Sequence, residues 1–175
     1  MTFISDSLNR IKPSATMVIT AKAAQLKREG KKVIGLSAGE PDFDTPDHVK
    51  VAAIDAINKG YTKYTNVEGI PELRQAIIDK FKKDNGLSYS INDVIVGTGG
   101  KQILFNALVG SINKDDEVII PAPYWVSYPD MTLLAGGKPV IISCSLETEF
   151  KLTAKELEKV VTKKSKWLIL NSPSN

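Results

Sequence analysis

Gly97-Thr98-Gly99-Gly100-Lys101 separates two apolar segments of different pattern. The residues before it are short and β-branched, which predicts a buried strand over 93–97. The residues after it predict a largely buried helix over 101–112. Glycines between a strand and a helix let backbone N–H groups approach a ligand, and the helix start adds unpaired donors and the positive end of the dipole. The stretch therefore predicts an anion site, most often one for phosphate.

The common nucleotide motifs do not fit this stretch. A Walker loop requires Gly where the chain has Ile95, and Ser or Thr where it has Gln102. The dinucleotide fingerprint requires Gly at that same Gln102. The phosphate is therefore expected to belong to another ligand. A tight strand-to-helix turn that binds nothing remains the alternative.

Short apolar segments alternate with helical patterns from residue 93 onward. Strands are predicted at 93–97, 117–120, 139–143 and 166–170, with helices at 101–112, 124–135 and 153–162. This alternation predicts a three-layer α/β/α fold with a mostly parallel sheet. Upstream, the sequence predicts a helix ending at Gly30, a short strand over 33–36, a helix capped by Thr45 and a helix opening at Pro71.

The bulk composition disfavours two classes of partner. The chain has 23 basic and 20 acidic residues, a balance of +3 that predicts neither a nucleic acid nor a membrane as partner. Cys144 is the single cysteine, which favours a reducing compartment, and we expect a cytoplasmic location. Cys144 is expected to pack against a strand and His48 to be solvated, so no metal site is predicted.

Five separated segments resemble motifs of the pyridoxal 5'-phosphate (PLP) dependent class I aminotransferases, fold type I. They follow the family's order along nearly the whole chain. They are the GEPDFDTP-like segment 37–46, the Y-x4-G-I-x2-L-R pattern of Tyr64 to Arg74, the turn 98–102, the aromatic segment 123–129 and Asn171-Ser172-Pro173-Ser174-Asn175. The chain is most similar to bacterial aspartate aminotransferases that begin K-P-S-A-T, here residues 12–16. Some members of that subgroup also transaminate prephenate.

The resemblance implies a set of cofactor-binding residues. Gly99, Gly100 and Lys101 are expected to donate backbone N–H groups to the PLP phosphate. Trp125 is expected to stack on the pyridine ring, and a buried core tryptophan is the alternative. The resemblance also implies that Asn175 hydrogen-bonds the phenolic oxygen of PLP. Tyr64 is expected to reach the phosphate in the neighbouring subunit, so the active form would be a homodimer.

The resemblance also implies how the substrates bind. Gly39 is expected beside the substrate carboxylate, in a site shared with Trp125 and Asn175. Lys101 and Thr16 are expected near the distal carboxylate of a dicarboxylic substrate. Lys12 is associated with prephenate in the subgroup. These residues favour transfer of the amino group between aspartate or glutamate and a 2-oxo acid such as 2-oxoglutarate or oxaloacetate.

The resemblance covers only the first part of the family pattern. We expect residues 1–45 to form an N-terminal arm and substrate loop, part of the small domain and dimer contact. Residues 46–175 are expected to form an incomplete PLP-binding large domain that stops after a core strand. No lysine here has the context of the family's Schiff-base lysine, so no catalytic residue is assigned, and the 175 residues alone are expected to be inactive.

Three other functions remain open at this point. A non-catalytic module that binds a phosphate-bearing ligand would also explain the glycine-rich turn. A structural or interaction domain would keep the motifs through ancestry alone. An aminotransferase for aromatic or branched-chain amino acids would share the cofactor site and differ in its substrate contacts.

Overall fold

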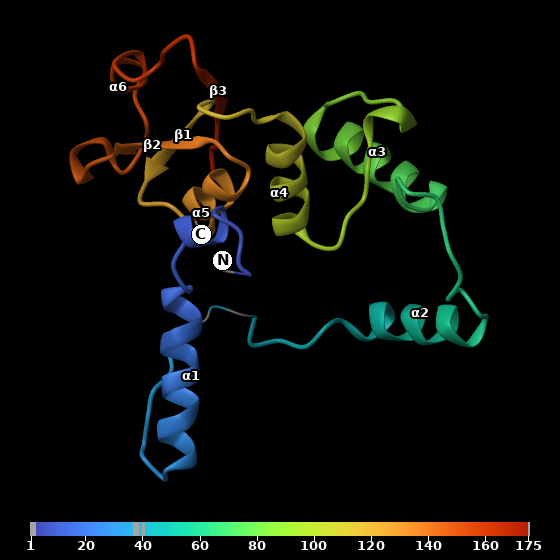
Figure 1. Cartoon of the computed structure of the whole chain (residues 1–175). Coiled ribbons are helices and arrows are strands. Elements are labelled where there is room, and N and C mark those ends of the chain that lie inside the picture. The colour runs from blue at the N-terminus through green and yellow to red at the C-terminus, as the bar shows by residue number, and fades with distance from the viewer. Residues whose placement is uncertain (1–2, 37–38, 40, 175) are drawn as a thin grey trace. The chain divides into compact units, whose positions relative to one another are not determined.

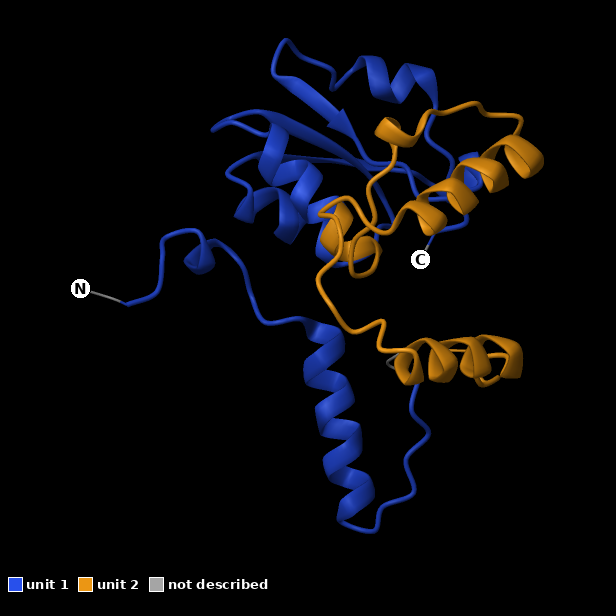
Figure 2. Cartoon of the chain, turned by 90° about the vertical axis from the view of Figure 1, so that its right-hand side faces the viewer, with its two compact units in different colours: residues 1–38, 104–175 blue, residues 39–103 orange. Residues whose placement is uncertain are grey.

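The chain is organised as two compact units in a computed structural model that describes residues 3–36, 39 and 41–174. The first unit comprises residues 1–38 and 104–175, and the second comprises residues 39–103. Figure 2 colours them blue and orange. All three strands found among the described residues belong to the first unit, and the glycine turn 97–100 belongs to the second. The predicted domain boundary at residue 45 remains a prediction.

A three-stranded parallel sheet organises the first unit (Figure 1). β1 (Glu117–Ala122) lies between β2 (Lys138–Ser143) and β3 (Ser165–Leu168), and it runs parallel to both. The predicted strands at 117–120, 139–143 and 166–170 are thus confirmed. Because the strands are parallel, their carboxyl ends share one edge of the sheet, which is where open α/β sheets place their ligands.

The α-helices occur close to where the sequence pattern predicts them, whereas the short 3-10 helices over 91–93 and 146–148 were not predicted. The helices of the first unit are η1 (Leu8–Arg10), α1 (Ala15–Arg28), α5 (Ser127–Leu134), η3 (Leu146–Thr148) and α6 (Ala154–Glu158). In the second unit they are α2 (Asp47–Asn58), α3 (Pro71–Asn85) and η2 (Ile91–Asp93). The helix α4 (Gly100–Ser111) starts in the second unit and continues into the first. None of the helices in the described ranges combines the length and hydrophobicity that crossing a bilayer needs.

The core of the first unit surrounds β1. Val118 and Ile120 are fully buried there, as their β-branched side chains suit a strand covered on both faces. They pack in one cluster with residues of α4 and α5 and with the residues that directly follow α4 and β3, namely Leu108, Ile112, Tyr128, Met131 and Ile169. This cluster holds α5 against the sheet and so sets the position of the segment that joins β1 to α5.

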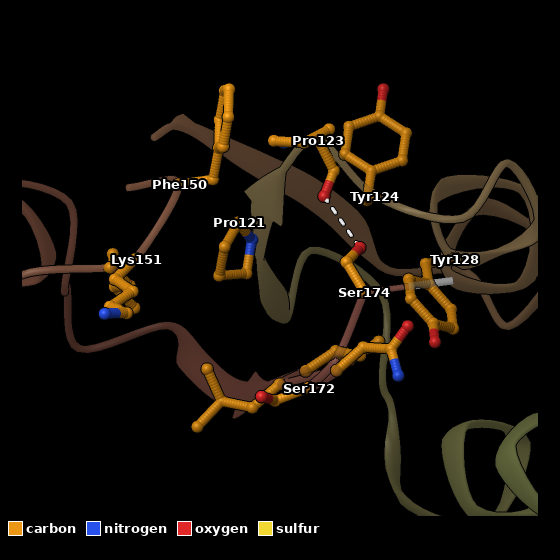
Figure 3. A pocket seen from close by; sticks show the side chains of 12 residues that line it. Pro121, Pro123, Tyr124, Tyr128, Phe150, Lys151, Ser172 and Ser174 are labelled. Atoms are coloured by element: carbon orange, nitrogen blue, oxygen red, sulfur yellow. Dashed lines mark hydrogen bonds between the residues drawn. The ribbon is translucent and has the colours of Figure 1, made fainter. Parts of the chain in front are cut away.

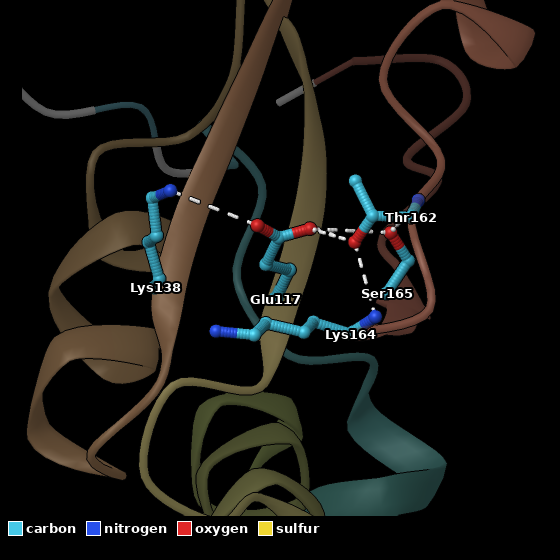
Figure 4. Close-up of polar contacts among 5 residues, drawn as sticks. All are labelled: Glu117, Lys138, Thr162, Lys164 and Ser165. Carbon is cyan, nitrogen blue, oxygen red and sulfur yellow. Dashed lines mark hydrogen bonds and ion pairs between the residues drawn. The ribbon is translucent and has the colours of Figure 1, made fainter.

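A polar cluster closes the amino end of the sheet (Figure 4). The carboxylate of Glu117, on β1, accepts hydrogen bonds from the hydroxyls of Thr162 at 2.6 Å and Ser165 at 3.4 Å. The ammonium of Lys138 lies 3.6 Å away. Since Lys138 begins β2 and Ser165 begins β3, Glu117 links all three strands. The Thr162 hydrogen bond, aided by the charge of Lys138, holds the pKa of Glu117 below its ordinary value against the effect of burial.

Two predicted strands are wrong. Residues 33–36 and 93–97 form no strand, and the sheet has three strands instead of the predicted four. Ile34 and Leu36 are 88% and 92% exposed. A strand needs a neighbouring strand to satisfy its N–H and C=O groups. Within the described residues, neither segment has such a neighbour.

Two helix ends also differ from expectation. Thr45 was expected to cap α2, but the residue that directly precedes the helix is Pro46. No side chain forms a capping hydrogen bond at this end of α2. The helix predicted over 153–162 ends at Glu158. Its predicted capping box is confirmed: the Thr153 hydroxyl accepts from the backbone N–H of Glu156 at 3.2 Å, and the Glu156 carboxylate accepts from the backbone N–H of Thr153 at 3.1 Å.

Candidate functional site

A pocket of about 260 Å³ opens at the carboxyl ends of β1 and β3 (Figure 3). Tyr124 and Tyr128 line it from the segment that follows β1 and from α5. Asn171 and Ser172 line it from the segment that follows β3. The hydroxyl of Ser174 donates a hydrogen bond to the carbonyl of Pro123 at 3.4 Å, which joins these two segments. The pocket therefore combines aromatic faces with amide and hydroxyl groups.

Trp125 lies next to this pocket without lining it. Its ring is half-buried, packs against the core cluster and meets the Tyr128 ring edge to face, with centroids 5.7 Å apart at 77°. The carbonyl of Trp125 accepts the backbone N–H of Tyr128 at 3.1 Å. The indole is therefore held against the core cluster and against Tyr128 of α5. A flat face fixed in this way suits stacking on a planar ring.

The glycine turn 97–100 lies in the second unit at the start of α4. Gly99 has φ +85°, which glycine adopts without the strain that a β-carbon would bring. The carbonyl of Gly99 accepts the N–H groups of Gln102 and Ile103 at 3.2 and 3.4 Å, which closes the first turn of the helix. The amide oxygen of Gln102 accepts the N–H of Thr98 at 2.5 Å. The turn is thus fixed by its own helix.

The space in front of this turn suits a phosphate. A β-carbon added at Gly99 or Gly100 would meet no atom within 4 Å, so the backbone there is open to a ligand. The first N–H groups of a helix have no partner within the helix, and they carry the positive end of its dipole. The residues at the start of α4 therefore fit the phosphate of the cofactor that the sequence suggested.

The remaining predicted site residues are distributed over both units. Tyr64 is fully exposed in the loop between α2 and α3, and Gly39 is exposed as well. Lys12 is exposed just before α1, and Thr16 is half-buried in the first turn of that helix. The side chain of Lys101 belongs to α4, at the glycine turn. Asn175 lies outside the described residues.

The sequence interpretation missed two residues that line the pocket. Tyr124 and Tyr128 were part of the aromatic segment, but only Trp125 was assigned a role. The position of Tyr124 just after β1 was a usable signal, because residues just beyond the carboxyl end of a parallel strand face the ligand side of the sheet. The role of Tyr128 also depends on α5, whose orientation the pattern alone does not specify.

The single cysteine, the single histidine and the carboxylates are further candidate site residues. The thiol of Cys144 is buried, and burial raises its pKa, which disfavours the nucleophilic thiolate. His48 is exposed, as expected. Across the described ranges, His, Cys, Asp and Glu residues form no group of three or more that is suited to a metal ion.

Comparisons with known proteins agree with this geometry. The family model for aminotransferase class I and II matches residues 31–175. A probable aspartate/prephenate aminotransferase of Rhizobium leguminosarum bv. phaseoli is 62% identical over the whole chain. The aspartate/prephenate aminotransferase of Cereibacter sphaeroides is also 62% identical over the whole chain. The chain spans 44% of the length of each of these relatives.

Solved structures are similar over the whole chain as well. The aspartate aminotransferase from Rhizobium meliloti has a TM-score of 0.95 at 52% identity, and the chain covers 44% of it. The aspartate aminotransferase from Thermus thermophilus with maleate has a TM-score of 0.96 at 46% identity, and the chain covers 46% of it. The described fold is thus the first part of a longer fold in both proteins.

Proposed function

Because this chain belongs to the class I and II aminotransferase family, we propose that the whole protein transfers an amino group between L-aspartate or L-glutamate and a 2-oxo acid. Enzymes of this family use PLP. The observation that supports the proposal most is the aromatic and amide-lined pocket at the carboxyl ends of β1 and β3, with the fixed Trp125 ring beside it. Four-carbon and five-carbon acids such as oxaloacetate and 2-oxoglutarate are the proposed acceptors.

We assign cofactor-binding roles to residues of both units. The backbone N–H groups of Gly99, Gly100 and Lys101 hold the phosphate, and Trp125 stacks on the ring. Asn175 binds the phenolic oxygen. When bound, PLP delocalises the electron pair that remains at the substrate Cα after its proton leaves. The residues of this chain orient the ring, neutralise the phosphate and exclude water from one ring face.

The substrate is proposed to be a dicarboxylic acid. Gly39 lies beside the substrate carboxylate in this proposal, while Lys101 and Thr16 face its distal carboxylate. The structure from Thermus thermophilus holds maleate, which is a dicarboxylate. The names of the two relatives above include prephenate, which also bears two carboxylates. We therefore propose prephenate as a further acceptor and Lys12 as a residue that serves it.

Two subunits are proposed to share each site. Tyr64 is fully exposed on its own chain, which leaves its hydroxyl accessible to a second copy. In the proposed homodimer this hydroxyl donates to the phosphate held by the neighbouring subunit. Each site then needs residues from both chains.

Steady-state kinetics of the whole protein test the proposal. The protein is dialysed free of PLP, and amino transfer from aspartate is then measured with 2-oxoglutarate, prephenate and phenylpyruvate as acceptors, with and without added PLP. We expect PLP-dependent turnover that is fastest with the dicarboxylic acceptors. A clear preference for phenylpyruvate would favour an aromatic aminotransferase. PLP binding without turnover of any acceptor would favour a non-catalytic binding module.

A further inference from the structure

Arg74 is a buried cation on a helix whose residues are mostly exposed. Of the residues of α3, only Arg74 and Ile78 are buried, and Arg74 is 8% exposed. Arginine stays charged in proteins, so its burial is tolerated only where its N–H groups find acceptors. Among the described residues, no carboxylate forms an ion pair with it. The acceptors must therefore be found elsewhere.

The guanidinium of Arg74 binds the backbone that leads into the glycine turn. Its Nε donates to the carbonyl of Val94 at 3.0 Å, and its Nη2 donates to the carbonyl of Ile91. A single planar group thus fixes both ends of the segment 91–94 to α3. Charge-assisted hydrogen bonds of this kind are about twice as strong as neutral ones.

A second contact fixes the next residues of the same segment. The N–H of Val96 donates to the carbonyl of Glu68 at 2.9 Å. Gly69 lies so close that a β-carbon on it would come within 2.9 Å of the Val96 Cβ. Residues 91–96 are therefore held by α3 and by the segment that precedes it, although they form no strand.

The other side of the glycine turn is held by α4. A β-carbon at Gly97 would lie 2.4 Å from the Ile103 Cδ1, so the turn rests against the first turn of the helix. The amide oxygen of Gln102 binds the N–H of Thr98. The turn is thus clamped between α4 on one side and the segment held by Arg74 on the other.

We propose that Arg74 is a positioning residue for the cofactor phosphate. Its guanidinium binds the carbonyls of Val94 and Ile91, and in this proposal it acts indirectly, by fixing residues 91–96, which lead directly into the turn 97–100. This inference rests on the proposed function, because it assumes that the turn binds the phosphate of PLP. Losing Arg74 should loosen the turn and weaken binding of the phosphate in particular.

The test compares two cofactor forms that differ only in the phosphate. Dissociation constants of PLP and of pyridoxal are measured for the whole protein and for Arg74→Gln, Arg74→Lys and Ile78→Ala. We expect Arg74→Gln to reduce the preference for PLP over pyridoxal about tenfold or more. Arg74→Lys should fall between Arg74→Gln and the wild type, because an ammonium cannot form the same two-pronged contact. Ile78→Ala destabilises the same helix without touching the carbonyls, so it should leave the preference unchanged.

Hydrogen exchange of the cofactor-free protein gives a second readout. We expect the amides of residues 94–100 to exchange about tenfold faster in Arg74→Gln, and Ile78→Ala to have no comparable local effect. The inference would be overturned if an Arg74 variant kept both the wild-type preference for PLP over pyridoxal and the wild-type amide exchange rates of residues 94–100. That result would leave the proposed function standing. A wild-type protein that binds PLP no better than pyridoxal would overturn the phosphate site itself. Arg74→Lys serves as the deciding variant where Arg74→Gln fails to fold.

Discussion

At the scale of single residues, two buried charged groups each hold several segments together through hydrogen bonds to backbone and side-chain groups. Glu117 ties three strands together at the amino end of the sheet, and Arg74 holds an unpaired segment in the second unit. Both groups are 7–8% exposed. Removing one partner from such a pair leaves a buried charge without compensation, which is more harmful than losing a surface contact.

Glu117→Gln should make stability less dependent on pH. The folded state lowers the pKa of Glu117 from its ordinary value of 4.5, so the folded protein resists protonation more than the unfolded chain does. This contribution is complete above about pH 4.5 and is lost as the pH falls through the lower folded pKa. We expect the variant to be less stable than the wild type at pH 7, with the difference shrinking below pH 4.5.

Urea unfolding of the whole protein from pH 3 to pH 7 measures this difference. The control is Glu147→Gln, which removes an exposed carboxylate away from the strands and should change the free energy of unfolding by at most about 0.5 kcal/mol. A constant difference between Glu117→Gln and the wild type across this range would refute the assigned role of the carboxylate.

Gly69→Ala should be more destabilising than Gly60→Ala. Both glycines have positive φ, +105° and +77°, so both substitutions introduce backbone strain of about 1–2 kcal/mol. Only at Gly69 would the new β-carbon also meet the Val96 side chain, while at Gly60 it meets nothing within 4 Å. We expect an additional loss of about 1 kcal/mol or more at Gly69, measured by chemical denaturation. Equal losses would mean that the contact between residues 69 and 96 is unimportant.

At the scale of elements, sequence patterns identify helices and central strands better than isolated strands. The apolar run of β1 and the capping box of α6 are local signals, and both are confirmed. The segments 33–36 and 93–97 have the same β-branched character, yet they form no strand. Their state depends on a neighbouring strand, which no local pattern reveals. The pocket was partly foreseeable, because Asn171 and the aromatic segment follow strands, but the place of Tyr128 depends on how α5 packs.

The capping box of α6 provides a test at this scale. Thr153→Ala removes the hydroxyl that accepts the backbone N–H of Glu156, so it should reduce the free energy of unfolding by about 1 kcal/mol. Ser145→Ala is the matched control, because Ser145 precedes η3 without forming a side-chain cap. We expect almost no change there. Equal effects of the two substitutions in thermal or urea unfolding would show that the box does not stabilise the helix.

At the scale of the whole molecule, the proposed site combines residues of two subunits. The chain spans 44% of the length of its relatives from Rhizobium and Cereibacter, and its predicted site residues occur in both compact units. Tyr64 is proposed to act on the neighbouring subunit, whereas Trp125 is proposed to act within its own. This difference can be tested directly by mixing subunits.

Mixed dimers of Tyr64→Ala and Trp125→Ala subunits should regain activity. If Tyr64 serves the neighbouring site, a mixed dimer has one site with both defects and one site with neither, so it should reach up to half of the wild-type turnover. If both residues act within one chain, each site carries one defect and no activity returns. The measurement compares turnover of the mixed preparation with that of each variant alone. Mixed dimers isolated with two different affinity tags provide the control for subunit exchange.

The central claim is that the whole protein moves an amino group from aspartate to a 2-oxo acid with PLP. Tracing nitrogen tests it most directly: ¹⁵N-labelled aspartate and 2-oxoglutarate are incubated with the PLP-free protein, with and without added PLP, and the products are analysed by mass spectrometry. The account predicts ¹⁵N-glutamate and an equal amount of oxaloacetate, formed only when PLP is present. Absence of ¹⁵N-glutamate, or its formation at the same rate without PLP, would contradict it.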